Sequence, residues 1–337
     1  QVIVIDPIIS IDSGYQFKAN QQVVSILTRE IGSGFKLDEL SPDNLTKAKY
    51  VLSGAISQRT DELGGTQSGC QLVITILELS SGAIKAKGQA SINGFQFEPS
   101  PFYEDSPLFL QDKSLRLAKL LFGWSVGQPA SQEYIEFLPA KAAIQQGISA
   151  YDLEQFANAA NWFSKAVALP TGKTLPAYTG LYLSSQKLHR DANANKAFTN
   201  LLTLAVAENR KLDLKLQFST NLPAFIPNPE LAKRYAGWLK NIAQFMQKNN
   251  VCLNISAHSS RSADASETER LSLSRSKTIQ GIMAATFPGI IKKSQVVGKG
   301  FQENIIGNSA NDASDAVDRR VEISVIDCSE LQKSTAN

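Results

Sequence analysis

Cysteine and histidine are scarce in this chain of 337 residues, which has three cysteines and two histidines. Cys70, Cys252 and Cys328 are widely spaced and form no CxxC pair, whereas structural zinc sites usually draw their ligands from closely spaced pairs. We therefore expect no metal site and no cofactor. In a cytosolic protein the three would be idle thiols, and in an exported protein one disulfide with one cysteine left over is reasonable.

Long hydrophobic runs and an excess of one charge are also absent. The longest apolar runs, VIVIDPIISI near the start and LAKLLFGW near residue 120, are broken by Asp, Pro or Lys and fall short of the roughly 20 residues that span a bilayer. The formal net charge is only +3, and the chain has no basic run that would indicate nucleic-acid binding. The chain opens at Gln1, so we interpret it as a mature or trimmed sequence that a signal peptide, or a lipid-modified cysteine, could once have preceded.

Residues that could perform catalysis are few. His258 precedes Ser259 and Ser260, but adjacent residues rarely converge on one substrate atom, and no third residue with an orienting role is evident. The GSG segment at residues 32–34 lacks the Gly-Lys-Ser/Thr of a phosphate-binding loop. The sequence therefore favours a protein that is not an enzyme.

Residues 1–125 have the pattern of an α/β domain. VIVIDPII is typical of a strand, and residues 20–31 place apolar side chains at helical spacing. Further strands are expected at residues 49–57, 71–79 and 83–92, the last two joined by a turn at residues 80–82. Glycines predict a loop at residues 61–69, and a helix is expected at residues 106–122.

This order of elements, with IDP after the first strand and YVLSGAIS in the middle, is similar to the N-terminal fold of the CsgG and penicillin-binding-protein-activator lipoproteins. The resemblance rests on element order and on the segment from Tyr50 to Gly54. It implies an α/β sandwich that engages protein partners.

Residues 126–210 are rich in alanine and carry helical rather than strand-like patterns. Small and aromatic residues there lie near the spacing of a tetratricopeptide repeat, namely Gly147, Ala150, Tyr151, Ala159, Phe163, Ala166 and Pro170. A second, looser copy follows with Ala177, Gly180, Tyr182, Ala192 and Phe198. An ordinary helical hairpin is the alternative. Because one or two repeats are too few for a long solenoid, we expect a connector or a small docking surface.

The most specific signals lie near the C-terminus. An AHSS turn at residues 257–260 is followed by RLSLSR at residues 270–275 and DRRVEI at residues 318–323. In this order they resemble the OmpA-like domain, a peptidoglycan-binding module whose usual motifs are GHTD, NxxLSxxR and NRRVEI. The interval from His258 to Arg275 fits the family pattern without a gap.

The resemblance implies that residues 211–330 form a βαβαββ domain of the α+β class, and the local patterns agree. Strands are expected at residues 214–220, 251–256, 295–300 and 319–326. Asn228 and Pro229 suit the N-cap and first position of one helix. Ser266 and Glu269 form a candidate capping box for the other.

The resemblance also implies a binding site in which Arg275 and Arg319 line a cleft at one end of the sheet. Guanidinium groups bind carboxylates in a bidentate way, which suits the acidic groups of a peptide stem. Arg320 is expected to point elsewhere, because adjacent strand residues alternate faces. The alternative is that the two arginines pair internally with Asp264, Asp315 or Asp318.

Ser260 departs from the family pattern. It stands where the family has the Asp that receives the amine of diaminopimelate, and a serine hydroxyl supplies no counter-charge. Asp264 or Asp318 could restore that charge from a nearby position, so both belong to the candidate site. If neither does, we expect the domain to have kept its fold and changed its partner.

A disulfide is implied by the same resemblance. The family site puts the end of the strand at residues 251–256 beside the start of the strand at residues 319–326, so the two strands must run antiparallel. Cys252 and Cys328 then fall together at the far end and share the less apolar side of the sheet.

We therefore predict a three-part α+β protein of the bacterial envelope that is not an enzyme. Its parts are a CsgG-like domain (residues 1–125), a helical connector (126–210) and an OmpA-like domain (211–330). We expect it in the periplasm, associated with the outer membrane, with peptidoglycan and envelope proteins as partners, no nucleic acid, and a lipid anchor upstream of Gln1 left open. It would position a secretion, fibre-export or wall-synthesis assembly. The alternative is a protein-interaction scaffold whose OmpA-like domain no longer binds peptidoglycan.

Overall fold

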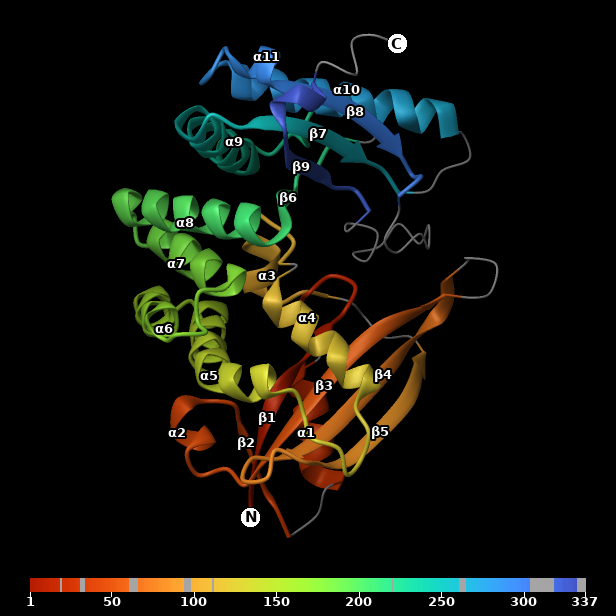
Figure 1. Ribbon diagram of the computed structural model, residues 1–337, viewed down its shortest axis with the longest axis vertical. Coiled ribbons are helices and arrows are strands. Elements are labelled where there is room, and N and C mark those ends of the chain that lie inside the picture. Colours follow the sequence, from red (N-terminus) through yellow and green to blue (C-terminus); the bar gives the residue numbers. More distant parts are fainter. Residues whose placement is uncertain are drawn as a thin grey trace. The chain divides into compact units, whose positions relative to one another are not determined.

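The computed structural model has the α+β architecture that the sequence predicts (Figure 1). It describes residues 1–18, 20–30, 34–60, 66–93, 98–110, 112–219, 221–260, 265–303 and 318–331. The chain divides into two compact units. The first comprises residues 1–106 and 110–197, and the second comprises residues 107–109 and 198–337.

The first unit is built on a five-stranded sheet in the order β2-β1-β3-β4-β5. The strands are β1 (Val2–Ser10), β2 (Lys36–Glu39), β3 (Tyr50–Thr60), β4 (Thr66–Glu78) and β5 (Ile84–Asn93). β1 pairs in parallel with both β2 and β3, whereas β3, β4 and β5 are antiparallel. The loop predicted at residues 61–69 is wrong at residues 66–69, which extend β4 by pairing with β3 and β5; residues 61–65 lie outside the described part.

Short helices surround this sheet. They are α1 (Asn20–Glu30), α2 (Pro42–Leu45), α3 (Pro101–Asp105), α4 (Lys113–Leu120) and the 3-10 helix η1 (Leu121–Gly123). The single helix predicted at residues 106–122 is wrong in its first part. Asp112 caps α4, since its carboxylate accepts a hydrogen bond of 2.8 Å from the Ser114 N–H, so the helix cannot begin earlier.

The long helices that follow are α5 (Gln132–Asp152), α6 (Phe156–Ala168), α7 (Leu175–Lys187) and α8 (Asp191–Asn209). Phe163 on α6 is fully buried between two glycines. A Cβ atom at Gly147 on α5 would lie 2.7 Å from its ring, and one at Gly180 on α7 would lie 2.2 Å from it. The small residues therefore allow close helix packing. The predicted domain boundaries and the tetratricopeptide likeness stay predictions.

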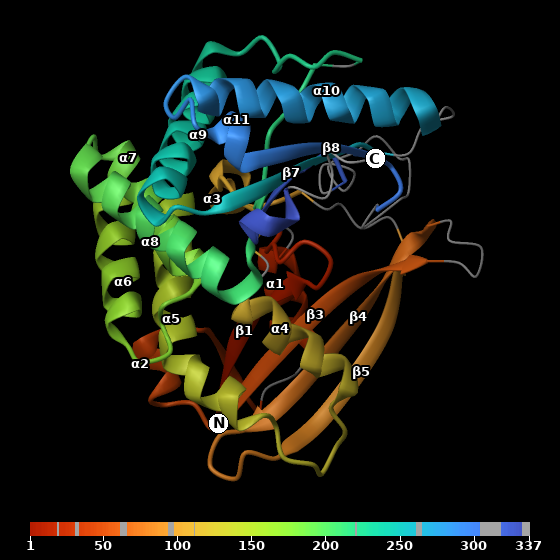
Figure 2. The same ribbon diagram turned by 45° about the horizontal axis from the view of Figure 1, so that its top comes forward.

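The second unit contains a four-stranded sheet in the order β6-β9-β7-β8. Its elements are β6 (Lys211–Leu214), α9 (Pro229–Asn249), β7 (Cys252–His258), α10 (Ala265–Ala284), α11 (Ile290–Lys293), β8 (Ser294–Gly300), β9 (Val321–Ile326) and the 3-10 helix η3 (Cys328–Glu330). β7 is parallel to β8 and antiparallel to β9. Figure 2 shows α10 lying along β7 and β8. The order of strands and long helices is the predicted βαβαββ.

Three local predictions in this unit are wrong and one is confirmed. The strand predicted at residues 214–220 instead covers Lys211–Leu214, because the chain beyond Leu214 turns into a loop. Ser266 lies inside α10 and not at its N-cap. Arg319 precedes β9, which begins at Val321. Asn228 does cap α9, accepting hydrogen bonds from the backbone N–H groups of residues 230 and 231 at 3.1 and 3.2 Å.

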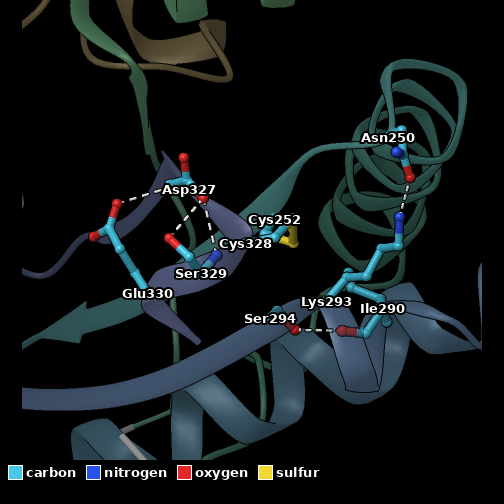
Figure 3. Close-up of a disulfide and its surroundings, with 9 residues drawn as sticks. All are labelled: Asn250, Cys252, Ile290, Lys293, Ser294, Asp327, Cys328, Ser329 and Glu330. Atoms are coloured by element: carbon cyan, nitrogen blue, oxygen red, sulfur yellow. Dashed lines mark hydrogen bonds between the residues drawn. A yellow bond between two sulfur atoms is a disulfide. The ribbon is translucent and has the colours of Figure 1, made fainter. Parts of the chain in front are cut away.

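Cys252 in β7 and Cys328 in η3 are joined by a disulfide with an S–S distance of 1.99 Å (Figure 3). Cys252 is the register partner of Ile326 in antiparallel β9, which places Cys328 just beyond that pair. Asp327 and Glu330 form a capping box that holds η3. The remaining cysteine, Cys70, is buried in β4. Within the described residues, no helix combines the length and apolar character that crossing a membrane requires.

Candidate functional site

The candidate site lies at one end of the central strands of the second unit's sheet, where β7 ends and β9 begins. The last register pair of β7 and β9 in this direction is Ala257 with Val321, and the His258 N–H donates a hydrogen bond of 2.9 Å to the Arg320 carbonyl. Residues 258–260 and 318–320 therefore lie next to one another at the same end of these two strands. Ser260 is half-buried there, whereas Asp264 and Asp315 lie outside the described residues.

Two serines of α10, Ser272 in the RLSLSR segment and Ser276 just after it, dock this helix on β8. The Ser272 hydroxyl accepts a hydrogen bond of 2.9 Å from the Gly300 N–H, and the Ser276 hydroxyl donates one of 2.7 Å to the Val297 carbonyl. A Cβ atom at Gly298 would lie 2.3 Å from a backbone oxygen of α10, so only glycine permits this approach. These contacts fix the part of α10 that carries Arg275, which lies between the two serines in the sequence.

The Arg275 side chain is held by neutral backbone groups. Only 6% of the residue is exposed. Its Nε donates to the Leu222 carbonyl at 3.3 Å and its Nη2 donates to the Ser219 carbonyl at 3.2 Å. The guanidinium carbon lies 4.9 Å from the centre of the Phe218 ring, a cation–π contact. Asp264 and Asp315, two of the three carboxylates considered for internal pairing, lie outside the described residues, so that alternative stays open.

The loop that supplies those carbonyls is tied to α9 through aromatic side chains. The Phe218 and Phe225 ring centres are 5.1 Å apart, and Phe225 lies 5.0 Å from Tyr235 on α9. The Tyr235 hydroxyl accepts a hydrogen bond of 3.3 Å from the Gln217 N–H. Asn221, with a φ of 55°, adopts the left-handed conformation at the tip. The sequence motifs gave no indication of this loop, because backbone acceptors leave no residue signature.

Two arginine charges act on one another at this end of the strands. The pKa of Arg275 is lowered to about 10, first by burial and second by the charge of Arg319. The Arg275 guanidinium group remains charged at neutral pH, since this pKa still lies well above 7. Two like charges held close together, one of them largely desolvated, favour an anion between or beside them. Asp318 is fully buried next to Arg319 in the sequence.

Arg320 contacts other residues than Arg275 does, as the sequence predicted. It is 5% exposed, donates from Nη1 to the Glu303 carbonyl at 3.3 Å, and lies 3.9 Å from the Glu322 carboxylate through Nη2. His258 lies beside this group, and its pKa is lowered to about 4 by burial first and by Arg320 second. A buried, neutral imidazole fits a structural role here. The described residues include no group of three His, Cys, Asp or Glu that could hold a metal ion.

No protein-family model and no curated protein matches this chain. Solved structures similar to part of it include the cell wall anchor of the T6SS from Pseudomonas aeruginosa (20% identity, 34% of this chain and 80% of that one, TM-score 0.28). Others are the OmpA-like domain of FopA1 from Francisella tularensis (14%, 34% and 75%, TM-score 0.27) and the peptidoglycan-associated lipoprotein from Burkholderia pseudomallei (14%, 33% and 88%, TM-score 0.28). At these TM-scores the likeness carries no argument about function. The resemblance to the OmpA-like domain therefore rests on the three motifs and the βαβαββ order.

Proposed function

We propose that the second unit binds peptidoglycan non-covalently, by holding a carboxylate of the peptide stem at Arg275 and Arg319. The observation that carries this proposal is that the charge of Arg319 acts on the buried guanidinium group of Arg275. That group donates its hydrogen bonds to neutral backbone carbonyls. A carboxylate would relieve the repulsion between them and accept charge-assisted hydrogen bonds. A ligand that brings its own negative charge is therefore favoured over a neutral one.

The amine of a diaminopimelate stem would need a counter-charge near Ser260. The serine hydroxyl accepts a hydrogen bond from an ammonium group but adds no charge. Asp318, which is buried at the same end of the strands, and Asp264 are the two carboxylates that the sequence offers for this role. A stem peptide that lacks an amine at this point would also fit the serine.

In this proposal the protein is a non-enzymatic component of the bacterial envelope, located in the periplasm and associated with the outer membrane. The second unit would hold the cell wall, and the first unit would engage proteins of a secretion, fibre-export or wall-synthesis assembly. The motifs at residues 257–260, 270–275 and 318–323 support the wall-binding part of this role.

Co-sedimentation with purified sacculi tests the proposal. Arg319→Ala removes one guanidinium, and Arg275→Lys keeps a charge but loses the bidentate fork. Each should weaken binding by roughly tenfold, since a charge-assisted contact in a partly buried site is worth about 1.5–3 kcal/mol. Arg270→Ala, which removes an exposed arginine from the same helix, is the matched control and should bind like the wild type. Wild-type binding in both site variants would refute the proposed site.

A protein-interaction scaffold is the second candidate, and two observations favour it. Ser260 replaces the charged residue of the family pattern, and the Nε and Nη2 atoms of Arg275 already bond to the loop carbonyls. On this alternative the wild-type protein would stay in the supernatant with sacculi from several bacteria. The same protein would then be recovered in a complex with envelope proteins after cross-linking in cells.

A further inference from the structure

A cavity in the first unit lies at the carboxyl ends of parallel strands. β1 pairs in parallel with β2 on one side and with β3 on the other. In open α/β sheets, ligands bind outside the carboxyl ends of the strands. The cavity here has a volume of about 440 Å³ and is lined by Ile5, Pro7 and Ile8 of β1 and by Glu39 and Leu40 at the end of β2.

The cavity exists because the sheet is interrupted at this position. Pro7 has no N–H to donate, and the register between β1 and β3 shifts between Asp6 and Ile9. β2 ends at Glu39, so its pairing with β1 stops at Ile5. The edge of β1 beyond Ile5 is therefore not covered by β2. The Asn20 side chain donates a hydrogen bond of 3.0 Å to the Ile8 carbonyl there.

Helices on opposite faces of the sheet form the remaining walls. Leu27 of α1 packs against Ile3 and Ile5, whereas Asp6, the next residue in β1, bonds to Tyr134 and Lys141 of α5. Since adjacent strand residues point to opposite faces, α1 and α5 cover different sides. The cavity reaches both helices past the end of β2, through Val23 and Leu27 of α1 and Gln145, Ser149 and Asp152 of α5.

The lining combines an apolar part with convergent polar groups, as small-molecule sites do. Ile5, Ile8, Phe17, Val23, Leu27 and Leu40 supply the apolar part. The polar part includes Ser100, which is 8% exposed, and the Gln16 and Gln145 amides, which share a hydrogen bond of 2.9 Å. Leu153 at the end of α5 also lines the cavity and is 67% exposed, which indicates that the cavity reaches solvent.

The charges of the lining favour a cation. Asp152 and Glu39 are carboxylates, and the one lysine of the lining, Lys18, forms an ion pair with Glu98. Asp152 accepts a hydrogen bond of 2.7 Å from the Phe102 N–H through Oδ1, and it lies among the polar groups of the wall. Burial raises the pKa of Asp152, and the nearby charge of Lys18 only partly opposes this effect, so a second cation would offset the remaining cost.

We infer that this cavity is a binding site for a small amphipathic amine, with the apolar body against α1 and β1 and the ammonium group at Asp152. The geometry combines a preformed space, an apolar wall and two carboxylates, Glu39 and Asp152, against one lysine, Lys18, whose ammonium group forms its ion pair with Glu98. This site is separate from the wall-binding proposal, because all of its residues belong to the first unit.

Three probes that share one alkyl chain test the inference on the full chain. n-Octylammonium, n-octanol and octanoate, each below its aggregation concentration, are titrated against the protein by NMR or calorimetry. n-Octylammonium should bind with a Kd at least tenfold lower than octanoate, and octanol should fall between them. Binding that favours octanoate would overturn the assignment of charge. No saturable binding of any probe would overturn the site.

Variants then locate the binding. Asp152→Asn keeps the acceptor for the Phe102 N–H but removes the charge, so it should weaken n-octylammonium about tenfold and leave octanol unchanged. Asp43→Asn, an exposed carboxylate on α2, is the matched control and should change neither. Ser149→Leu fills part of the cavity and should weaken all three probes. If Asp152→Asn fails to fold, the wild-type probe series and Ser149→Leu still decide the proposal. Unchanged n-octylammonium binding in both folded variants would refute it.

Discussion

At the scale of single residues, burial has different consequences for two basic side chains of the second unit. Arg275 stays charged at neutral pH, whereas His258 is neutral. Burial lowers the pKa of Arg275 only to about 10, so it keeps its proton at neutral pH. The same effect moves the pKa of His258 to about 4, so its imidazole is neutral in the folded protein. The two arginines that follow one another, Arg319 and Arg320, each act on a different one of these groups.

His258 should make the protein sensitive to acid. The unfolded imidazole takes up a proton near pH 6.5 and the folded one only near pH 4, so stability is present above pH 6.5 and is lost as the pH falls through that window. Between pH 7 and pH 5 the loss should be about 2 kcal/mol. Urea unfolding at both pH values, compared between wild type and His258→Gln, isolates this contribution. Equal pH dependence in the two proteins would contradict it.

Ser260→Asp should strengthen binding to wall fragments that contain diaminopimelate. The residue lies half-buried at the same edge as Arg319, and an added carboxylate would face the amine that the family's Asp receives. A partly exposed pair of this kind contributes about 1 kcal/mol, or roughly fivefold in affinity. Ser266→Asp adds the same charge on exposed α10 and serves as the control in titration. An equal gain in both variants would point to a general charge effect.

At the scale of elements, the close packing of the helices α5, α6 and α7 depends on glycine at the positions that face Phe163. Gly180→Ala would place a Cβ atom 2.2 Å from the Phe163 ring, where the neighbouring helices leave no space. The expected destabilisation is about 1–3 kcal/mol. Phe163→Leu in the same protein should recover part of the loss. Gly237→Ala on α9, whose Cβ would meet nothing within 4 Å, should instead stabilise slightly, and thermal unfolding measures all three.

Elements long enough to show a period could be predicted from the sequence, and short ones could not. Each strand of five residues or more in the structure overlaps a predicted run, whereas β2, with four residues, and the similarly short α2 and α3 were missed. A strand was predicted at residues 214–220, but Phe218 packs against Arg275 and Phe225 in a loop. Motif residues of the site were found by pattern. The carbonyls of residues 219 and 222 were not, because every residue has one.

At the scale of the whole molecule, the disulfide links the fold to the compartment in which the protein works. Cys252 and Cys328 are 76 residues apart in the sequence, with a Cα–Cα distance of 5.2 Å, so the bond joins distant parts of the second unit's sequence. Such a bond persists in oxidising compartments and is rare in the cytosol. A periplasmic location therefore predicts that this pair is oxidised in cells.

Peptide mapping without reductant on protein made in the periplasm should recover one linked peptide pair containing Cys252 and Cys328, with Cys70 as a free thiol because it is buried in the other unit. A Cys252→Ser, Cys328→Ser variant should lose about 4 kcal/mol of stability, since the bond closes a loop of 76 positions in the unfolded chain. Cys70→Ser is the control for loss of a thiol. Free thiols at both positions, in protein made in this oxidising compartment, would contradict the bond and would remove the part of the argument for export that rests on it.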